Sequence, residues 1–231
     1  SSIVRETDAH VLTEAGPEIG VASTKAFVAQ LAAAVLLAVR LGSATGKLTR
    51  AAGTALLDEL RRLRPRLETL LAQAEEERIR ELADRHRNVK GFLFLARGVN
   101  YPVALEGALK LKEISYMHAE GYPAGEMKHG PIALVEPDLT TVAIGSLGRV
   151  ADKLRSNIEQ VKARGGRVIS VGSDPQAHAI AEEAIPVPPT SEWLSPILNV
   201  VPLQLLAYHI ADLRGCDIDK PRNLAKSVTV E

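Results

Sequence analysis

Three charged residues stand at helical spacing in the stretch YPVALEGALKLKEISYMH, and their types suit proton transfer. Lys110 follows Glu106 by four residues and precedes Glu113 by three, so the three side chains share one stripe with Met117. A carboxylate beside a lysine can move a proton next to a carbonyl group. Spacing alone favours a simpler interpretation, an exposed ladder of ion pairs worth roughly 0.2–0.5 kcal/mol each. Against it, the residues around the stripe are mostly small or apolar.

A second candidate lies a dozen residues further on, in the stretch GEMKHGP from Gly125 to Pro131. Two glycines and a proline make this a shaped loop rather than a helix or a strand, and it presents Lys128 and His129. Close to the carboxylate stripe, His129 would complete a set of groups suited to acid and base catalysis. A loop histidine is equally often a surface residue, and both interpretations stay open.

The C-terminal stretch DIDKPRNLAKSVTVE carries the third candidate. Its polar composition is typical of a frayed end, yet Pro221 restricts it and the apolar residues Val228 and Val230 favour docking. Docking would bring Lys226 with it, and a desolvated lysine can form an imine because burial lowers its pKa. Near the start of the chain, Ser23 and Thr24 are expected to cap a helix, whose free N–H groups could also bind phosphate.

Composition narrows the class of function. Twenty-eight basic and twenty-eight acidic residues cancel, which disfavours nucleic acid and anionic membranes as partners. Cys216 is the only cysteine, so a reducing, cytoplasmic location is expected. No cluster of His, Cys, Asp and Glu has the spacing of a metal site, so no metal is expected. The apolar run Ala26 to Val39 is shorter than the roughly 20 residues that span a bilayer, and predicts a buried helix.

Apolar runs and helical periodicity alternate along the second part of the chain, which predicts a parallel sheet covered on both faces. The expected strands are Ala9–Ala15, Val89–Gly98, Leu139–Ile144, Arg167–Val171 and Ala184–Val187. The expected helices are Gly20–Leu41, two or more between Thr49 and Arg87 with a break at Pro65, Pro102–His118, Ala151–Arg164 and Trp193–Leu213. The first part holds one expected strand, too few for a sheet.

Four stretches together resemble the glucosamine-6-phosphate synthase family, the isomerising glutamine:fructose-6-phosphate aminotransferases. They are EIGVASTKAF (Glu18 to Phe27), the run from Tyr101 to Pro131, VPLQLLAYHIA (Val201 to Ala211) and DKPRNLAKSVTVE. The resemblance implies the last part of an isomerase region built from two sugar-isomerase (SIS) lobes. The expected fold is α/β, a three-layer αβα sandwich with a parallel sheet over residues 75–231, preceded by an incomplete, mostly helical remnant of a first SIS lobe over residues 1–74.

The resemblance also implies roles for single residues. Glu113 would move the proton between C1 and C2 of the sugar, beside Lys110, and Lys226 would form an imine with the open-chain sugar. His129 would open the sugar ring from the neighbouring subunit of a homodimer. The substrate contacts implied by the resemblance are Val21, Ser23 and Ala225. Fructose 6-phosphate and ammonia would give glucosamine 6-phosphate without a metal or an organic cofactor.

This sequence departs from the family pattern in what it lacks. It has no N-terminal glutaminase domain with its cysteine nucleophile, and it lacks the Ser/Thr-rich loops that hold the sugar phosphate in the first lobe. Ammonia would therefore come from outside the chain, and turnover by this chain alone stays open. Two alternatives remain beside the enzyme: an SIS module that binds a sugar phosphate without catalysis, and a dimerisation core.

Overall fold

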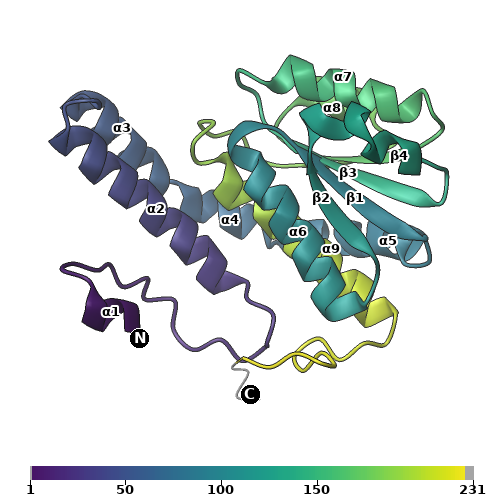
Figure 1. Cartoon of the computed structure of the whole chain (residues 1–231), viewed down its shortest axis with the longest axis horizontal. Helices are drawn as coiled ribbons and strands as arrows, with labels where there is room; N and C mark the ends of the chain where they lie inside the picture. The colour runs from purple at the N-terminus through teal and green to yellow at the C-terminus, as the bar shows by residue number, and fades with distance from the viewer. Residues whose placement is uncertain (1, 227–231) are drawn as a thin grey trace.

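The computed structural model describes residues 2–226, except the side chain of Ala74, and it contains a parallel sheet between two layers of helices (Figure 1). The strands are β1 (Gly91–Ala96), β2 (Ala119–Pro123), β3 (Leu139–Gly145), β4 (Arg167–Gly172) and β5 (Glu183–Pro186). They pair in the order β2-β1-β3-β4-β5, and every pairing is parallel. The expected α/β fold with an αβα sandwich is confirmed.

Helices on the two faces of the sheet bury alternate residues of its strands. Helices α5 (Gln73–His86), α6 (Tyr101–Ser115) and α9 (Ser195–Leu213) cover the face that receives Phe92 and Phe94. Helices α7 (Ala151–Lys162) and α8 (Pro175–Ile180) cover the face that receives Leu93 and Leu95. Because both faces are covered, β1 is buried along its whole length, as its continuous apolar run predicts.

The chain between β2 and β3 differs from the loop expected over Gly125–Pro131. Two short 3-10 helices, η2 (Ala124–His129) and η3 (Pro131–Leu134), occupy it, and a third, η1 (Gly98–Asn100), precedes α6. Gly130 joins η2 to η3 with φ at 147°, a backbone conformation that residues with a side chain rarely adopt. The expectation that glycine gives this segment its backbone freedom is therefore correct at Gly130. The expectation of a segment without helical turns was wrong.

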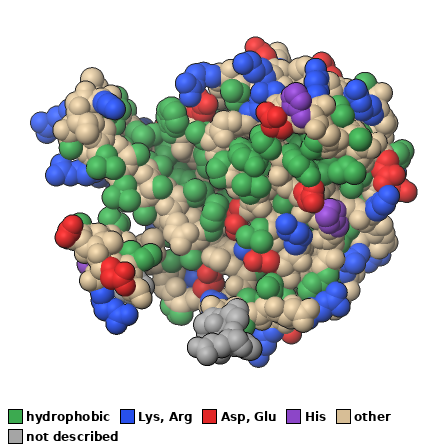
Figure 2. All heavy atoms as spheres, in the orientation of Figure 1, with side chains coloured by type: hydrophobic (Ala, Val, Ile, Leu, Met, Phe, Trp, Pro, Cys, Tyr) green, Lys and Arg blue, Asp and Glu red, His purple; other side chains and the backbone are tan. Residues whose placement is uncertain are grey.

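The N-terminal part consists of helices, α1 (Ser2–Glu6), α2 (Lys25–Ala44), α3 (Arg50–Arg61) and α4 (Leu63–Leu70). Helices α2 and α3 form a hairpin that extends away from the sheet (Figure 1), and the face shown in Figure 2 carries many hydrophobic side chains along it. Only Val39 of α2 is buried, so the expectation of a buried helix over Ala26–Val39 was wrong. An apolar composition favours burial, but burial needs covering elements, and in the described part α2 packs mainly on α3 and α9.

Among the described residues, two helices, α2 and α9, are long and apolar enough to cross a membrane by length and composition. Most of the apolar window of α9 lies inside the core, so for α9 the same properties reflect packing against the sheet. Helix α2 has only 6% of its window buried. The length and composition of α2 are thus compatible with a helix that packs on another protein segment as well as with a membrane helix.

Three further expectations were wrong in detail. Residues 9–15 form no strand and are mostly exposed, because no neighbouring strand is available there to pair with them. Helix α2 begins at Lys25 rather than at Gly20. The break between α3 and α4 falls at Arg62, and Pro65 lies in the first turn of α4, where a missing N–H costs nothing.

Candidate active site

In the charged stripe of α6, Glu106 and Lys110 are buried and Glu113 is half-buried. Lys110 is 4% exposed and Glu106 is 9% exposed. The Nζ atom of Lys110 lies 2.6 Å from Oε2 of Glu113 and 3.4 Å from Oε1 of Glu106. One ammonium group thus stands between two carboxylates, and the interpretation as an exposed ladder of ion pairs is wrong. Burial strengthens such interactions and makes each group depend on its neighbours.

Burial also changes the proton affinity of Glu106. The pKa of Glu106 is raised, chiefly because burial disfavours its charged form, and the charge of Glu113 raises it further. The charge of Lys110 and the hydrogen bond from it act in the opposite direction. A buried carboxylate with a shifted pKa beside a lysine is a frequent feature of sites that transfer protons.

A cavity of about 370 Å³ opens beside this stripe. Lys110 and Ile114 of α6 and Gln204 and Tyr208 of α9 form its floor. Residues from the segment Pro17 to Lys25 and from the C-terminal tail form its rim. Figure 1 shows the same arrangement, with the chain after α9 running back to meet the segment that precedes α2. Segments far apart in the sequence therefore enclose one pocket next to the acid and base groups.

The segment before α2 is organised by Glu18. Its Oε1 accepts a hydrogen bond from the backbone N–H of Thr24 at 2.7 Å, whereas the side chain of Thr24 makes no capping bond to the helix. Burial by itself raises the pKa of Glu18, but hydrogen bonds from Thr24, Ser23 and Ala26 and the charge of Lys226 lower it more. The predicted cap at Ser23 and Thr24 is thus replaced by a carboxylate six residues upstream, and Ser23 contributes by binding that carboxylate.

The C-terminal tail docks against the same segment. The N–H of Val21 donates to the carbonyl oxygen of Asp219 at 3.0 Å, and Nζ of Lys226 donates to the carbonyl oxygen of Glu18. Ala225 and Lys226 are exposed and Val21 is half-buried, and none of the three lines the cavity. Docking of the tail agrees with the expectation from its sequence, but the expected desolvation of Lys226 was wrong, because Lys226 is exposed. The apolar residues Val228 and Val230, on which part of that expectation rested, lie outside the described residues.

His129 lies on the other side of the sheet from the stripe. It is exposed at the end of η2, whose buried residues Ala124 and Met127 pack in the same cluster as Leu154 of α7. The stripe belongs to α6, which packs on the opposite face with α9. Within one chain, Lys110 lines the pocket and pairs with Glu113, and Lys226 contacts Glu18, another residue of the lining. His129 lies outside the pocket.

Two residues of the pocket, Glu18 and Asp219, were missed as site residues. Glu18 stands in a stretch that the sequence singles out, and a carboxylate a few residues before a helix start is a signal for capping. Asp219 contributes its backbone carbonyl, which no side-chain pattern could reveal. In the described residues, no group of three or more His, Cys, Asp or Glu is placed to hold a metal ion.

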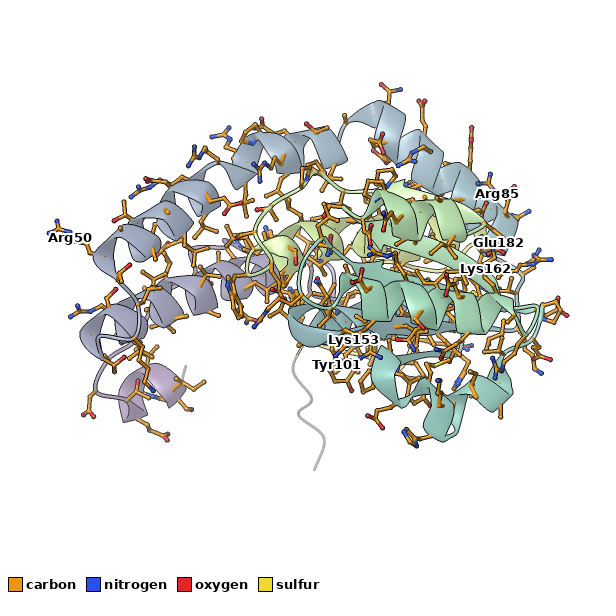
Figure 3. The ribbon with its side chains drawn as sticks, turned by 90° about the horizontal axis from the view of Figure 1, so that it is seen from above. Arg50, Arg85, Tyr101, Lys153, Lys162 and Glu182 are labelled. Atoms are coloured by element: carbon orange, nitrogen blue, oxygen red, sulfur yellow. The ribbon has the colours of Figure 1, made fainter. Side chains whose placement is uncertain are left out.

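Other polar clusters and cavities lie away from this pocket. A cavity of about 740 Å³ between α2, α3 and the start of α9 is lined mostly by apolar residues. At the far end of the sheet, Lys162 and Glu182 form an ion pair at 3.0 Å close to Arg85 (Figure 3). Arg50 marks the tip of the helical hairpin at the opposite end of the molecule (Figure 3). A cavity of about 290 Å³ at that end of the sheet is lined by Arg85, His86, Glu182 and Glu183, and the buried His86 contacts Glu183 there.

Comparison with known proteins shows the family to which the chain belongs. Residues 87–213 match the SIS domain family. The chain is 52% identical over 235 residues to a glutamine–fructose-6-phosphate aminotransferase (isomerising) of Pseudomonas putida and to one of Thermus thermophilus. Each of these alignments covers 100% of this chain and 38% of the relative, so the chain spans well under half the length of these relatives.

The fold comparison agrees. The C-terminal domain of glucosamine-fructose-6-phosphate aminotransferase from Francisella tularensis matches with a TM-score of 0.90 and 38% identity, over 95% of this chain and 62% of that one. The resemblance seen in the four sequence stretches is confirmed by these alignments. The chain belongs to the SIS domain family.

Proposed function

We propose that this chain is the isomerase part of a glucosamine-6-phosphate synthase, which converts fructose 6-phosphate and ammonia to glucosamine 6-phosphate. The observation that carries the proposal is the Lys110–Glu113 pair, in which the buried Lys110 lies 2.6 Å from Glu113 beside a cavity that the C-terminal tail helps to line. The family of the relatives supports the substrate and the reaction, since their names specify both an aminotransferase and an isomerisation.

The proposed chemistry assigns a task to each group at the pocket. The amine of Lys226 adds to the C2 carbonyl of the open-chain sugar, and loss of water gives an imine. Ammonia can then displace the Lys226 amine from this imine. Glu113 takes a proton from one of the carbons C1 and C2 and returns it to the other, which is the isomerisation step. Lys110 holds the Glu113 carboxylate in place. Val21, Ser23 and Ala225 contact the sugar, and no metal or organic cofactor takes part.

His129 enters the proposal through a homodimer. It lies outside the pocket of its own chain, so ring opening by His129 requires a second subunit that places it at the neighbouring pocket. We also propose that the glutaminase domain and the phosphate-binding loops belong to the parts of the relatives beyond the aligned 38%. A cytoplasmic location is supported by the single cysteine, which fits a reducing compartment. The balanced charge supports the absence of nucleic acid and membrane partners.

Borohydride trapping tests the imine step directly. The chain is incubated with fructose 6-phosphate, reduced, digested and analysed by mass spectrometry, together with the variants Lys226→Arg and Lys220→Arg. Lys220 is also an exposed lysine of the tail, which makes Lys220→Arg a matched control. We expect a sugar-phosphate adduct on Lys226 in the unchanged chain and in Lys220→Arg, and none in Lys226→Arg.

The absence of an adduct, with a full-length relative trapped in parallel, would overturn the proposed catalysis by this chain. Calorimetry with fructose 6-phosphate then separates the two alternatives. Binding without an adduct would indicate a sugar-phosphate sensor, and neither binding nor an adduct would leave a dimerisation core.

A further inference from the structure

Tyr116 ends helix α6 in an unusual backbone conformation. Its φ and ψ of 60° and 18° are left-handed, and its N–H donates to the carbonyl oxygen of Lys112. Glycine is the usual residue at such a helix end, because a side chain makes this conformation unfavourable. A strained residue persists only where its surroundings hold it, so the contacts of its side chain indicate what it is for.

Both parts of the Tyr116 side chain contact one residue of the C-terminal tail. The guanidinium carbon of Arg222 lies 4.2 Å from the centre of the Tyr116 ring. The backbone N–H of Arg222 donates to the hydroxyl oxygen of Tyr116 at 2.9 Å. The ring face attracts the cation, and the hydroxyl group fixes the backbone of the same residue. Tyr116 thus holds the tail 106 positions further along the chain.

Arg222 stands four residues before Lys226, and the tail between its anchors is folded into turns. Asp219 is tied to Val21, and the N–H of Lys220 donates to Oδ1 of Asp217 at 2.9 Å. Asn223, directly after Arg222, has φ at 64° and turns the chain. We call the contacts between Tyr116 and Arg222 the clamp. In the described chain it is the last side-chain anchor before the tail reaches Lys226 and the carbonyl of Glu18.

We propose that Tyr116 and Arg222 are positioning residues that set the place of Lys226 relative to the Lys110–Glu113 pair. The physical reason is their position on the helix. Tyr116 follows Glu113 by three residues on the element that carries the acid and base groups, so one rigid helix holds both these groups and the anchor of the tail. This inference rests on the proposed function, because it gives Lys226 a role at the sugar.

The alternative is that Tyr116 only closes the helix, and substitutions at this position separate the two. Tyr116→Gly relieves the strain and keeps the helix end, since glycine favours this backbone conformation. Tyr116→Asn also tolerates the left-handed region and serves as a second variant should glycine loosen the helix. Tyr116→Phe keeps the ring and removes the hydroxyl group. Arg222→Ala removes the cation from the other side.

The first measurement needs no substrate. Hydrogen exchange of the amides of residues 222–226 is followed in each variant, with the amides of α6 as the internal reference. We expect exchange of the tail to rise by about tenfold in Tyr116→Gly, from loss of a cation–π contact and a hydrogen bond, while α6 stays protected. Tyr116→Phe should give an intermediate rise. Unchanged exchange of the tail in Tyr116→Gly, Tyr116→Asn and Arg222→Ala would overturn the proposal.

The second measurement links the clamp to the imine. The rate of borohydride trapping on Lys226 is measured over a series of fructose 6-phosphate concentrations. A positioning role predicts a lower maximal rate in Tyr116→Gly and Arg222→Ala with the half-saturating concentration unchanged, and partial recovery in Tyr116→Phe. Faster exchange of the tail with an unchanged maximal rate would overturn the role. Failure of the unchanged chain to form any adduct would instead count against the proposed function, and hydrogen exchange would still decide whether the clamp exists.

Discussion

The ammonium group of Lys226 donates a hydrogen bond to the backbone carbonyl oxygen of Glu18, 208 positions earlier in the chain. The side chain of the same Glu18 accepts the N–H of Thr24 at the start of α2. The tail, the rim of the cavity and the entry into α2 thus meet at one residue. Local changes at Glu18 should therefore affect two distant parts of the chain.

Glu18→Ala should loosen the start of α2. The carboxylate replaces a side-chain cap, so its removal leaves the N–H groups of Thr24 and Ala26 without this acceptor. We expect faster hydrogen exchange for the amides of residues 24–28, with the amides near Val39 unchanged. Glu14→Ala is the matched control, because Glu14 is an exposed acidic residue of the same segment. Equal exchange in both variants would contradict the capping role.

Lys110→Met should destabilise the fold strongly. It keeps the length of the side chain but leaves Glu106 and Glu113 without the cation between them, and breaking a buried ion pair in this way costs about 3–5 kcal/mol. Urea unfolding at neutral pH measures the loss. Lys112→Met, on the exposed side of the same helix, should change the free energy of unfolding by less than about 0.5 kcal/mol. A similar effect of both variants would show that burial of the stripe is not what matters.

Glu183→Gln should lower stability at neutral pH and flatten its dependence on acid. Burial raises the pKa of Glu183, but hydrogen bonds and charges from His86 and Arg85 lower it more, to a net value below the ordinary 4.5. A carboxylate whose pKa is lowered by folding stabilises the fold at pH values above its pKa in the unfolded chain. That contribution is lost as pH falls through its pKa in the folded chain. The expected loss at pH 7 is about 2 kcal/mol.

The measurement is thermal or urea unfolding of Glu183→Gln between pH 3 and 7, beside Glu159→Gln, an exposed control on α7. The difference in unfolding free energy between Glu183→Gln and the unchanged chain should shrink as pH falls below about 4.5. Glu159→Gln should show no such change with pH. Parallel curves for Glu183→Gln and the unchanged chain across this range would speak against the His86–Glu183 contact as a source of acid sensitivity.

His209→Leu should stabilise the fold. His209 is 2% exposed, and neither ring nitrogen has a hydrogen-bond partner in the described structure; Nε2 lies 3.8 Å from Oε1 of Glu76. An apolar side chain removes this unsatisfied group, for an expected gain of about 1 kcal/mol. The gain is measured by urea unfolding at pH 7.5. The polar variant His209→Gln should give no gain there.

The same residue should make stability depend on pH. Burial lowers the pKa of His209 and the charge of Arg80 adds to this, while Glu76 and Asp212 oppose it. The unfolded chain therefore takes up the proton first, so stability is full above pH 6.5 and falls as pH drops from 6.5 toward the lower folded value. His209→Leu should remove this slope. A slope that survives the substitution would have to arise from another group.

Gly107→Ala should destabilise the fold although alanine favours helices. An added Cβ would lie 2.8 Å from Cδ1 of Leu203 and 2.9 Å from Cε1 of Phe94, where α6 approaches α9 and the sheet. Overpacking costs about 1–3 kcal/mol, which exceeds the helix preference of about 1 kcal/mol. Urea unfolding of Gly107→Ala, Leu203→Val and the double variant measures the coupling. Additive effects, within about 0.5 kcal/mol, would exclude the clash with Leu203 as the cause.

Much of the fold follows from the sequence, because parallel strands buried on both faces read as short apolar runs. The runs Val89–Gly98, Leu139–Ile144 and Arg167–Val171 predicted β1, β3 and β4 to within a few residues. Strand β2 was missed, since AEGYP contains glycine and proline and lies at an edge of the sheet. Its extended form depends on pairing with β1, which its own residues do not encode.

The sequence by itself determined the strand and helix alternation and the spacing that puts Glu106, Lys110 and Glu113 on one stripe of a helix. Only the tertiary structure decided that the stripe is buried, that it lies beside a cavity closed by Glu18 and the tail, and that His129 points elsewhere. The physical reason is range. Periodicity reports contacts between residues three or four apart, whereas burial and closure of a pocket depend on segments that meet only after the whole chain has folded.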